Sequence, residues 1–165
     1  MTLQHLTDID GIQKAVYDKQ FHETLAALAD KLLRFPEGCR VCVADGTPVG
    51  YMFSHPGRLN SPPGLNKILD AAIGAADNDC YFIHDIAVMR SHRRLGVARR
   101  FLTYALGVAS THRYTIVTLV SVQGTRVYWQ SPEFRFHAVQ GPKETLDYIR
   151  QSYGDAACYM VRRIA

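Results

Sequence analysis

The chain has 165 residues, of which 47% are apolar and 21% are charged, and its formal net charge at pH 7 is +4. These values predict one globular domain over residues 1–165, large enough to fold without disulfide bonds. They argue against a membrane span, which needs about 20 apolar residues, and against nucleic-acid binding driven by net charge alone. The opening segment MTLQHLTDID lacks the pattern of a signal peptide, so we expect a cytoplasmic protein.

Hydrophobic spacing in the first half of the chain predicts two amphipathic helices followed by a β-hairpin. Thr7 or Asp8 is the expected cap of the first helix, and Asp45-Gly46 is typical of a tight hairpin turn. A segment rich in Pro, Gly and Asn then predicts a long functional loop with one short helix inside it. The predicted elements are a helix over 7–20, a helix over 22–35, a hairpin over 39–55, and a loop over 56–79 whose inner helix covers 66–73.

The second half of the chain mixes buried strands with helices. The segment CYFIHDIAVM is nearly all apolar, which is typical of a central strand covered on both faces. This mixture predicts an α/β domain built on a central mixed sheet. The predicted elements are strands over 80–89, 114–122, 133–139 and 156–164, and helices over 98–110, 124–131 and 143–153.

Cys39 and Cys42 have the C-x-x-C spacing that zinc and redox sites use. A zinc site would need a second such pair, which the sequence lacks, and a redox site would need the motif to open a helix. Because CRVCVAD is typical of a strand, we expect free thiols and no bound metal.

The sequence HRRLGVARR at 92–100 lies between a predicted strand and a predicted helix. The N-terminus of a helix favours an anion, and Gly96 lets the backbone approach a phosphate because it has no side chain. Arg93 and Arg94 would add charge-assisted hydrogen bonds. The motif is neither a dinucleotide fingerprint nor a Walker A loop. Because the arginines are confined to one turn without an aromatic platform, we expect no nucleic-acid partner.

These residues resemble the signature of the GNAT superfamily of N-acetyltransferases. Ile86-Ala87-Val88 at the end of a strand is followed by Arg93-x-x-Gly96-x-Ala98 at the family's spacing, and FPEGC and YGDAACYM are similar to a bacterial-type subgroup. The resemblance implies a mixed, mostly antiparallel sheet of about six to seven strands with helices on both faces. It also implies acetyl-CoA as cosubstrate, with no metal. The cofactor residues that it implies are Ile86, Ala87, Val88, Arg93, Arg94, Leu95, Gly96, Val97, Ala98, Arg99, Gln123 and Trp129.

Two positions depart from the family pattern. Gln123 stands where the family usually has Asn, and Trp129 stands where many members have a tyrosine that acts as the general acid. An indole cannot act as an acid, and we expect the neighbouring Tyr128 to point elsewhere on its short helix. The identity of the acid therefore stays open. So does a second interpretation, a CoA-binding sensor or interaction domain that has lost catalysis.

Acetyl transfer to an amine needs the neutral amine, and deprotonating an alkylamine with a pKa near 10.4 costs roughly 4–5 kcal/mol at pH 7. Regular strand alternation would place His84 on the same face as Val88, with Asp85 on the opposite face. In arylalkylamine-type members a histidine in this position is the base, so the resemblance implies that role for His84, with a core histidine as the alternative. Asp85 is expected as a structural acceptor or a catalytic group, and either Tyr153 or a water is expected to return the proton.

Tyr17, Phe21 and His22 fall between the first two helices, where members of the superfamily line the acceptor site. We therefore expect these residues to bind the acceptor, which is a small-molecule amine or the amine of a peptide. Dimers are common among similar proteins, so a homodimer is one expected assembly.

Overall fold

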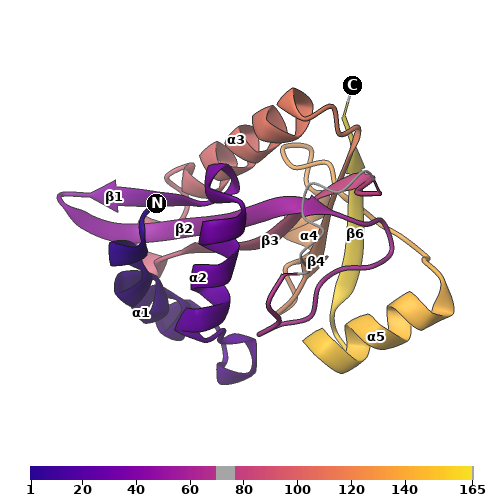
Figure 1. Cartoon of the computed structure of the whole chain (residues 1–165), viewed down its shortest axis with the longest axis horizontal. Helices are drawn as coiled ribbons and strands as arrows, with labels where there is room; N and C mark the ends of the chain where they lie inside the picture. Colours follow the sequence, from indigo (N-terminus) through magenta and orange to yellow (C-terminus); the bar gives the residue numbers. More distant parts are fainter. Residues whose placement is uncertain (70–76, 165) are drawn as a thin grey trace.

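A mixed sheet forms the centre of the computed structural model, which describes residues 1–69 and 77–164 (Figure 1). In those residues the six strands have the order β1-β2-β3-β4-β6-β5, and neighbours are antiparallel except for β3 and β4. No helix among the described residues is both long enough and apolar enough to cross a bilayer. The strands are β1 (Arg40–Ala44), β2 (Thr47–Gly57), β3 (Cys80–Val88), β4 (Ile116–Ser121), β5 (His137–Ala138) and β6 (Cys158–Arg163). The helices are α1 (Leu6–Val16), α2 (Leu25–Arg34), α3 (Val97–Thr111), α4 (Arg126–Gln130) and α5 (Lys143–Tyr153).

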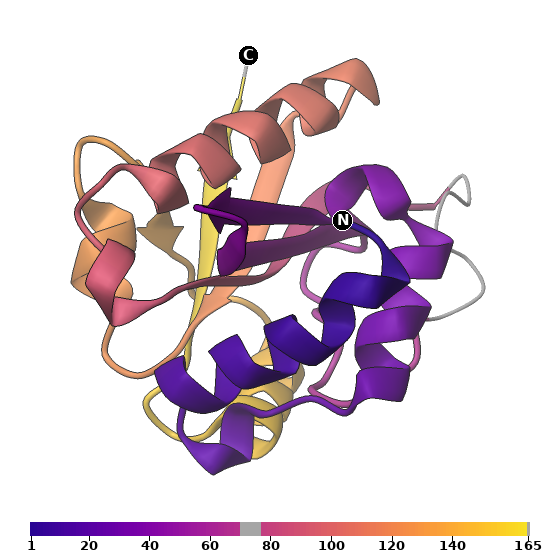
Figure 2. The same ribbon diagram turned by 90° about the vertical axis from the view of Figure 1, so that its left-hand side faces the viewer.

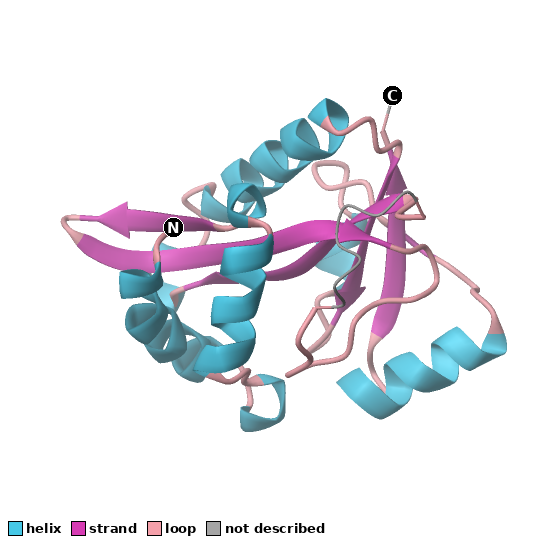
Figure 3. Ribbon diagram, viewed as in Figure 1, coloured by secondary structure: helices cyan, strands magenta, loops and turns pink. Residues whose placement is uncertain are grey.

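Helices cover both faces of this sheet (Figures 2 and 3). On one face α3 packs Phe101 into a cluster with Ile83 of β3. On the other face α1 and α2 enclose Tyr51 of β2. α5 packs Ile149 against Tyr159 near the β6 end of the sheet. The arrangement confirms the predicted mixed sheet with helices on both sides, and the hydrophobic clusters lie between the sheet and its helices.

Local signals set several element boundaries. α5 occupies the predicted residues 143–153. The β1–β2 hairpin turns at Asp45 and Gly46, whose φ values of 49° and 77° suit a two-residue turn. α1 begins at Leu6, upstream of both caps expected from the sequence. In the loop before β3, residues 66–69 are not helical, and the rest of the expected short helix lies outside the described residues.

The strand predicted over 133–139 is mostly a turn, and only β5 pairs with β6. Arg135 has a φ of 58°, and its N–H donates to the carbonyl of Ser131 at 2.9 Å, so the chain reverses at this point. The turn carries Phe134 and Phe136 into the cluster beneath α3. Burial of these two rings accounts for the apolar alternation that predicted a strand.

Candidate active site

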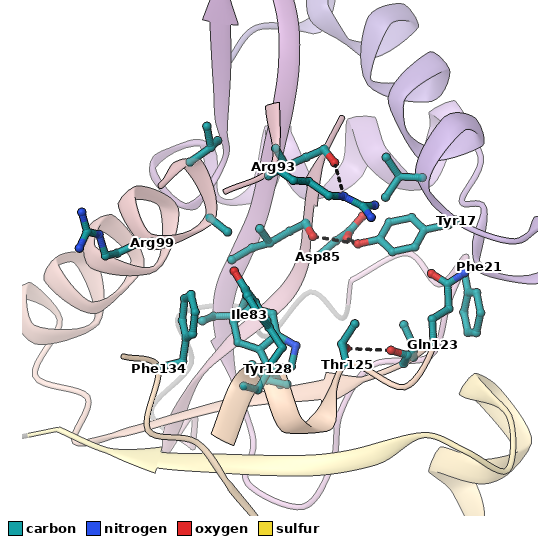
Figure 4. Close-up of a pocket in the computed structure, with 18 of the residues that line it drawn as sticks. Tyr17, Phe21, Ile83, Asp85, Arg93, Arg99, Gln123, Thr125, Tyr128 and Phe134 are labelled. Carbon is teal, nitrogen blue, oxygen red and sulfur yellow. Dashed lines mark hydrogen bonds between the residues drawn. The ribbon is translucent and has the colours of Figure 1, made fainter. Parts of the chain in front are cut away.

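The main cavity lies where β3 and β4 part. These strands pair only over Tyr81–Ile83 and Val117–Leu119, and the pairing ends there. A cavity of about 1080 Å³ is lined by the rest of β3, the turn before α3, the end of β4, α4 and the segment after α1 (Figure 4). Ligand cavities usually measure roughly 300–1,000 Å³, so this one is large enough for an extended cofactor.

The backbone edge of β3 faces this cavity. The N–H of Met89 donates to β2 at 2.9 Å, and successive N–H groups of a strand point to opposite edges. The N–H groups of Ile86 and Val88 therefore point toward the gap. Their carbonyls point there as well, since Tyr17 Oη donates to Ile86 O at 2.9 Å and Arg93 Nε donates to Val88 O at 3.3 Å. This edge can pair with an amide-containing chain such as a pantetheine arm.

The turn before α3 has the geometry of an anion site. Gly96 is the N-cap residue with a φ of 78°, and a Cβ there would meet no atom nearer than Arg99 Nη2 at 3.9 Å. The first N–H groups of a helix have no partner within it and carry the positive end of its dipole. Each residue from 93 to 99 lines the cavity, and Arg90 joins them. The turn before α3 therefore fits a phosphate group such as the pyrophosphate of CoA.

A β-bulge in β3 changes the face that His84 occupies. Phe53 of β2 pairs with Asp85, and the next residue of β2 pairs with Ile83, so His84 is an extra residue in the ladder. Val88 packs beneath α3, whereas the side chain of His84 points to the opposite side of the sheet, toward α2. The expectation that these two residues share a face is wrong, because the bulge shifts the alternation by one residue.

The side chain of His84 belongs to a buried ion-pair network. His84 Nε2 lies 3.0 Å from Glu23 Oε2, and Lys31 Nζ of α2 lies 3.0 Å from Glu23 Oε1. All three side chains are no more than 3% exposed. Burial would raise the pKa of Glu23, but His84 and Lys31 together hold that pKa well below its usual range. The ring of His84 is therefore directed into the protein, and its Nδ1 is buried without a hydrogen-bond partner among the described residues.

Asp85 adjoins this network and lines the cavity. Tyr17 Oη donates to Asp85 Oδ1 and Tyr51 Oη donates to Oδ2, both at 2.6 Å (Figure 4 shows the first of these bonds). Burial raises the pKa of Asp85, although the two phenol hydrogen bonds act to lower it. Tyr17 lines the cavity, whereas Tyr51 is fully buried behind the carboxyl group. The structure thus brings two expected site residues, Tyr17 and Asp85, into direct contact.

α4 places in the cavity a tyrosine that the sequence pattern assigned elsewhere. Tyr128 lines the cavity, and its ring packs on Phe134 with a centroid distance of 4.6 Å (Figure 4). Burial, together with Glu133, raises the pKa of Tyr128. Trp129 also lines the cavity, and it packs on Phe136 at 5.8 Å. The expectation that Tyr128 points away is wrong, because both neighbours on this short helix reach the same wall.

The end of the cavity nearest α1 contains most of the expected acceptor residues. Tyr17 and Phe21 line it, and so does Tyr153, which was expected to return the proton. Tyr153 is buried, its hydroxyl donates to Pro63 O, and burial raises its pKa. His22 does not line the cavity, because its ring turns back so that Nε2 lies 2.9 Å from Tyr17 O.

The cofactor residues expected from the sequence line the cavity with one exception. Ala87 packs its side chain with Tyr51 on the α1–α2 face, because β3 alternates there. Gln123 lines the cavity from a left-handed turn with a φ of 50°. The cavity residues Glu23 and Tyr128, and Tyr51 behind Asp85, were not predicted as site residues.

The cysteines lie apart from this chemistry. Cys39 and Cys42 are free thiols, and burial raises the pKa of Cys39 to about 12. In residues 1–69 and 77–164 no three His, Cys, Asp or Glu side chains form a group that could hold a metal ion.

Known proteins resemble this chain in sequence and in fold. The sequence model of the Acetyltransferase (GNAT) family matches residues 5–137. The fold is similar to that of the GphF GNAT-like decarboxylase in complex with isobutyryl-CoA, with a TM-score of 0.72, 13% identity, and coverage of 99% of this chain and 96% of that one. Ard1 from Thermoplasma volcanium gives a TM-score of 0.71, 16% identity, and coverage of 100% and 95%. Rv2747 from Mycobacterium tuberculosis, in complex with CoA and NLQ, gives a TM-score of 0.69 and 14% identity, with coverage of 99% of this chain and 96% of that one. No curated protein sequence matches the chain.

Proposed function

The chain belongs to the acetyltransferase (GNAT) family, and from that premise we propose that it is an N-acetyltransferase that moves the acetyl group of acetyl-CoA to a primary amine. One observation carries the proposal. The left-handed Gly96 turn and the outward edge of β3 at Ile86 and Val88 line the same cavity. The first can hold a pyrophosphate, and the second can hold the amide-rich arm that links it to the acyl group.

Each part of the cavity has a role in this reaction. Acetyl-CoA supplies an acetyl group activated as a thioester. The first N–H groups of α3 bind the pyrophosphate, and the N–H of Val88 donates to the thioester oxygen, where negative charge develops. Tyr128 supplies the proton that the leaving sulfur takes up, since a phenol is a proton donor on the cavity wall.

The acceptor enters at the α1 end of the cavity, between Tyr17, Phe21 and Tyr153. These aromatic side chains suit the carbon skeleton of a small amine or of a peptide N-terminus. A reaction that consumes acetyl-CoA also fits the cytoplasmic location expected from the sequence.

Tyr128 bears on the alternative of a CoA-binding domain without catalysis. That alternative rested on Trp129 occupying the usual place of the tyrosine. Because the phenol of Tyr128 lines the cavity, the chain retains a side chain that can act as the acid, and the case for an inactive domain is weaker.

The test combines binding with turnover. Acetyl-CoA binding is measured by calorimetry, and CoA release is followed with a panel of primary alkylamines and of peptides with free N-termini. We expect binding together with release that depends on one class of acceptor. Binding without turnover on any amine would instead favour the sensor domain, and no binding at all would contradict both.

A further inference from the structure

The proton of the acceptor amine needs a route out of the cavity, and the side chain of His84 does not offer a direct one. His84 is one of the residues that line the cavity, but its side chain is 1% exposed and its Nε2 is held by Glu23 at 3.0 Å. Asp85 is the neighbouring titratable group, and it too is covered, by Tyr17 on one oxygen and Tyr51 on the other. Of the two tyrosines, Tyr17 lines the cavity.

We propose that Tyr17 and Asp85 form a proton relay, in which the acceptor ammonium gives its proton to Tyr17 Oη while Tyr17 passes its own proton to Asp85 Oδ1. This inference rests on the proposed acetyltransferase function and names the proton acceptor of that site. Tyr51 acts as a positioning residue, because its hydroxyl holds the second carboxylate oxygen at 2.6 Å.

The geometry at Tyr17 supports a transfer of this kind. Its hydroxyl lies between two acceptors, Asp85 Oδ1 at 2.6 Å and Ile86 O at 2.9 Å. Among the described residues no group donates a hydrogen bond to Tyr17 Oη, so the phenol oxygen can accept one from the amine. Ile86 belongs to the β3 edge that faces the cavity, so the relay begins beside the place proposed for the acyl group.

The electrostatic setting makes Asp85 the end of the relay. Burial and the nearby carboxyl of Asp85 raise the pKa of Tyr17 well above its usual range, while Arg93 acts in the opposite direction. Tyr17 therefore does not ionise alone, and it releases its proton only as it receives another. Burial raises the pKa of Asp85, which favours the protonated carboxyl at the end of the step. The other titratable groups that act on this pair are His84 and Glu23.

The proton balance of the reaction closes. The ammonium loses one proton to the relay, and the electron pair left on nitrogen forms the bond to the acyl carbon as the carbon–sulfur bond breaks. The sulfur gains a proton from Tyr128. The nitrogen loses a second proton, and this proton reprotonates Tyr128. Asp85 releases the relay proton to solvent after the products leave.

The experiment compares two classes of acceptor. An alkylamine is protonated at pH 7, whereas hydroxylamine is largely neutral and needs no relay. Asp85→Asn and Tyr17→Phe are each expected to lower kcat/KM for the alkylamine by roughly 10²–10⁴-fold, with a much smaller loss for hydroxylamine. In Asp85→Asn the alkylamine rate should rise about tenfold per pH unit toward the amine pKa near 10.4, because only the free amine then reacts.

Tyr51→Phe is the matched control. It also removes one tyrosine hydroxyl that donates to Asp85, but Tyr51 does not line the cavity. The relay predicts a much larger loss of alkylamine turnover in Tyr17→Phe than in Tyr51→Phe. Equal losses in the two variants, or equal losses for both acceptor classes in Asp85→Asn, would overturn the relay while leaving the acetyltransferase function in place. An acidic limb that persists in Asp85→Asn but disappears in His84→Gln would also overturn it. Wild-type protein that binds acetyl-CoA and acetylates neither class overturns the proposed function, and the relay with it.

Discussion

Replacing Gly96 with valine tests the anion site at the start of α3. Gly96 has a φ of 78°, and left-handed backbone costs an L-residue roughly 1–2 kcal/mol. A Cβ there has open space, with Arg99 Nη2 the nearest atom at 3.9 Å, so we expect no further loss from crowding in the protein. The loss in binding should be larger, because the added methyl groups stand where a phosphate approaches the helix N-terminus. Losing one charge-assisted hydrogen bond of roughly 1.5–3 kcal/mol weakens acetyl-CoA binding about 10–150-fold.

Gly46 provides a matched control in the β1–β2 hairpin. Its φ is 77°, and a Cβ there meets no atom within 4 Å. Gly46→Val should therefore lower the free energy of unfolding about as much as Gly96→Val does, while leaving the acetyl-CoA dissociation constant unchanged. Calorimetry and urea denaturation of both variants separate the two effects. If Gly96→Val binds acetyl-CoA as tightly as Gly46→Val, the phosphate assignment is wrong.

Three further predictions concern the acid, the thiols and the buried ion pairs. Tyr128→Phe should lower kcat by about 10²-fold with acetyl-CoA affinity nearly unchanged, and an unchanged kcat would remove this phenol from the mechanism. A Cys39→Ser, Cys42→Ala double variant should keep its activity with a modest loss of stability, and stoichiometric zinc in the protein purified without added metal would contradict that. Glu23→Gln should lower the free energy of unfolding at pH 7 by about 3–5 kcal/mol, because it leaves Lys31 buried without an anion. Folding depresses the pKa of Glu23, so its contribution is fully present above the unfolded value near 4.3 and is lost progressively as the pH falls from there toward the much lower folded pKa. Urea unfolding should therefore show a smaller difference between variant and wild type at pH 3 than at pH 7, and an equal difference would refute this account.

The sequence alone determined the parts of this protein that depend on local chemistry. Asp45-Gly46 predicted the hairpin because few residues accept two successive positive φ values. The amphipathic segment 143–153 predicted α5, since its apolar spacing needs no distant partner to be recognised. The cofactor turn was equally readable, because Gly96 and its arginines lie within one strand–turn–helix unit.

Only the tertiary structure decided which side chains meet around the reacting atoms. The bulge at His84 depends on how β3 pairs with β2, and a shift of one residue moves the following side chains to the other face. The same register sets Asp85 between Tyr17, which lies 68 residues away in the sequence, and Tyr51, which lies 34 residues away. Whether Tyr128 reaches the cavity depends on the rotation of a five-residue helix packed on Phe134. Such placements result from long-range packing, which no short stretch of sequence encodes, and they decide the route that the amine proton takes.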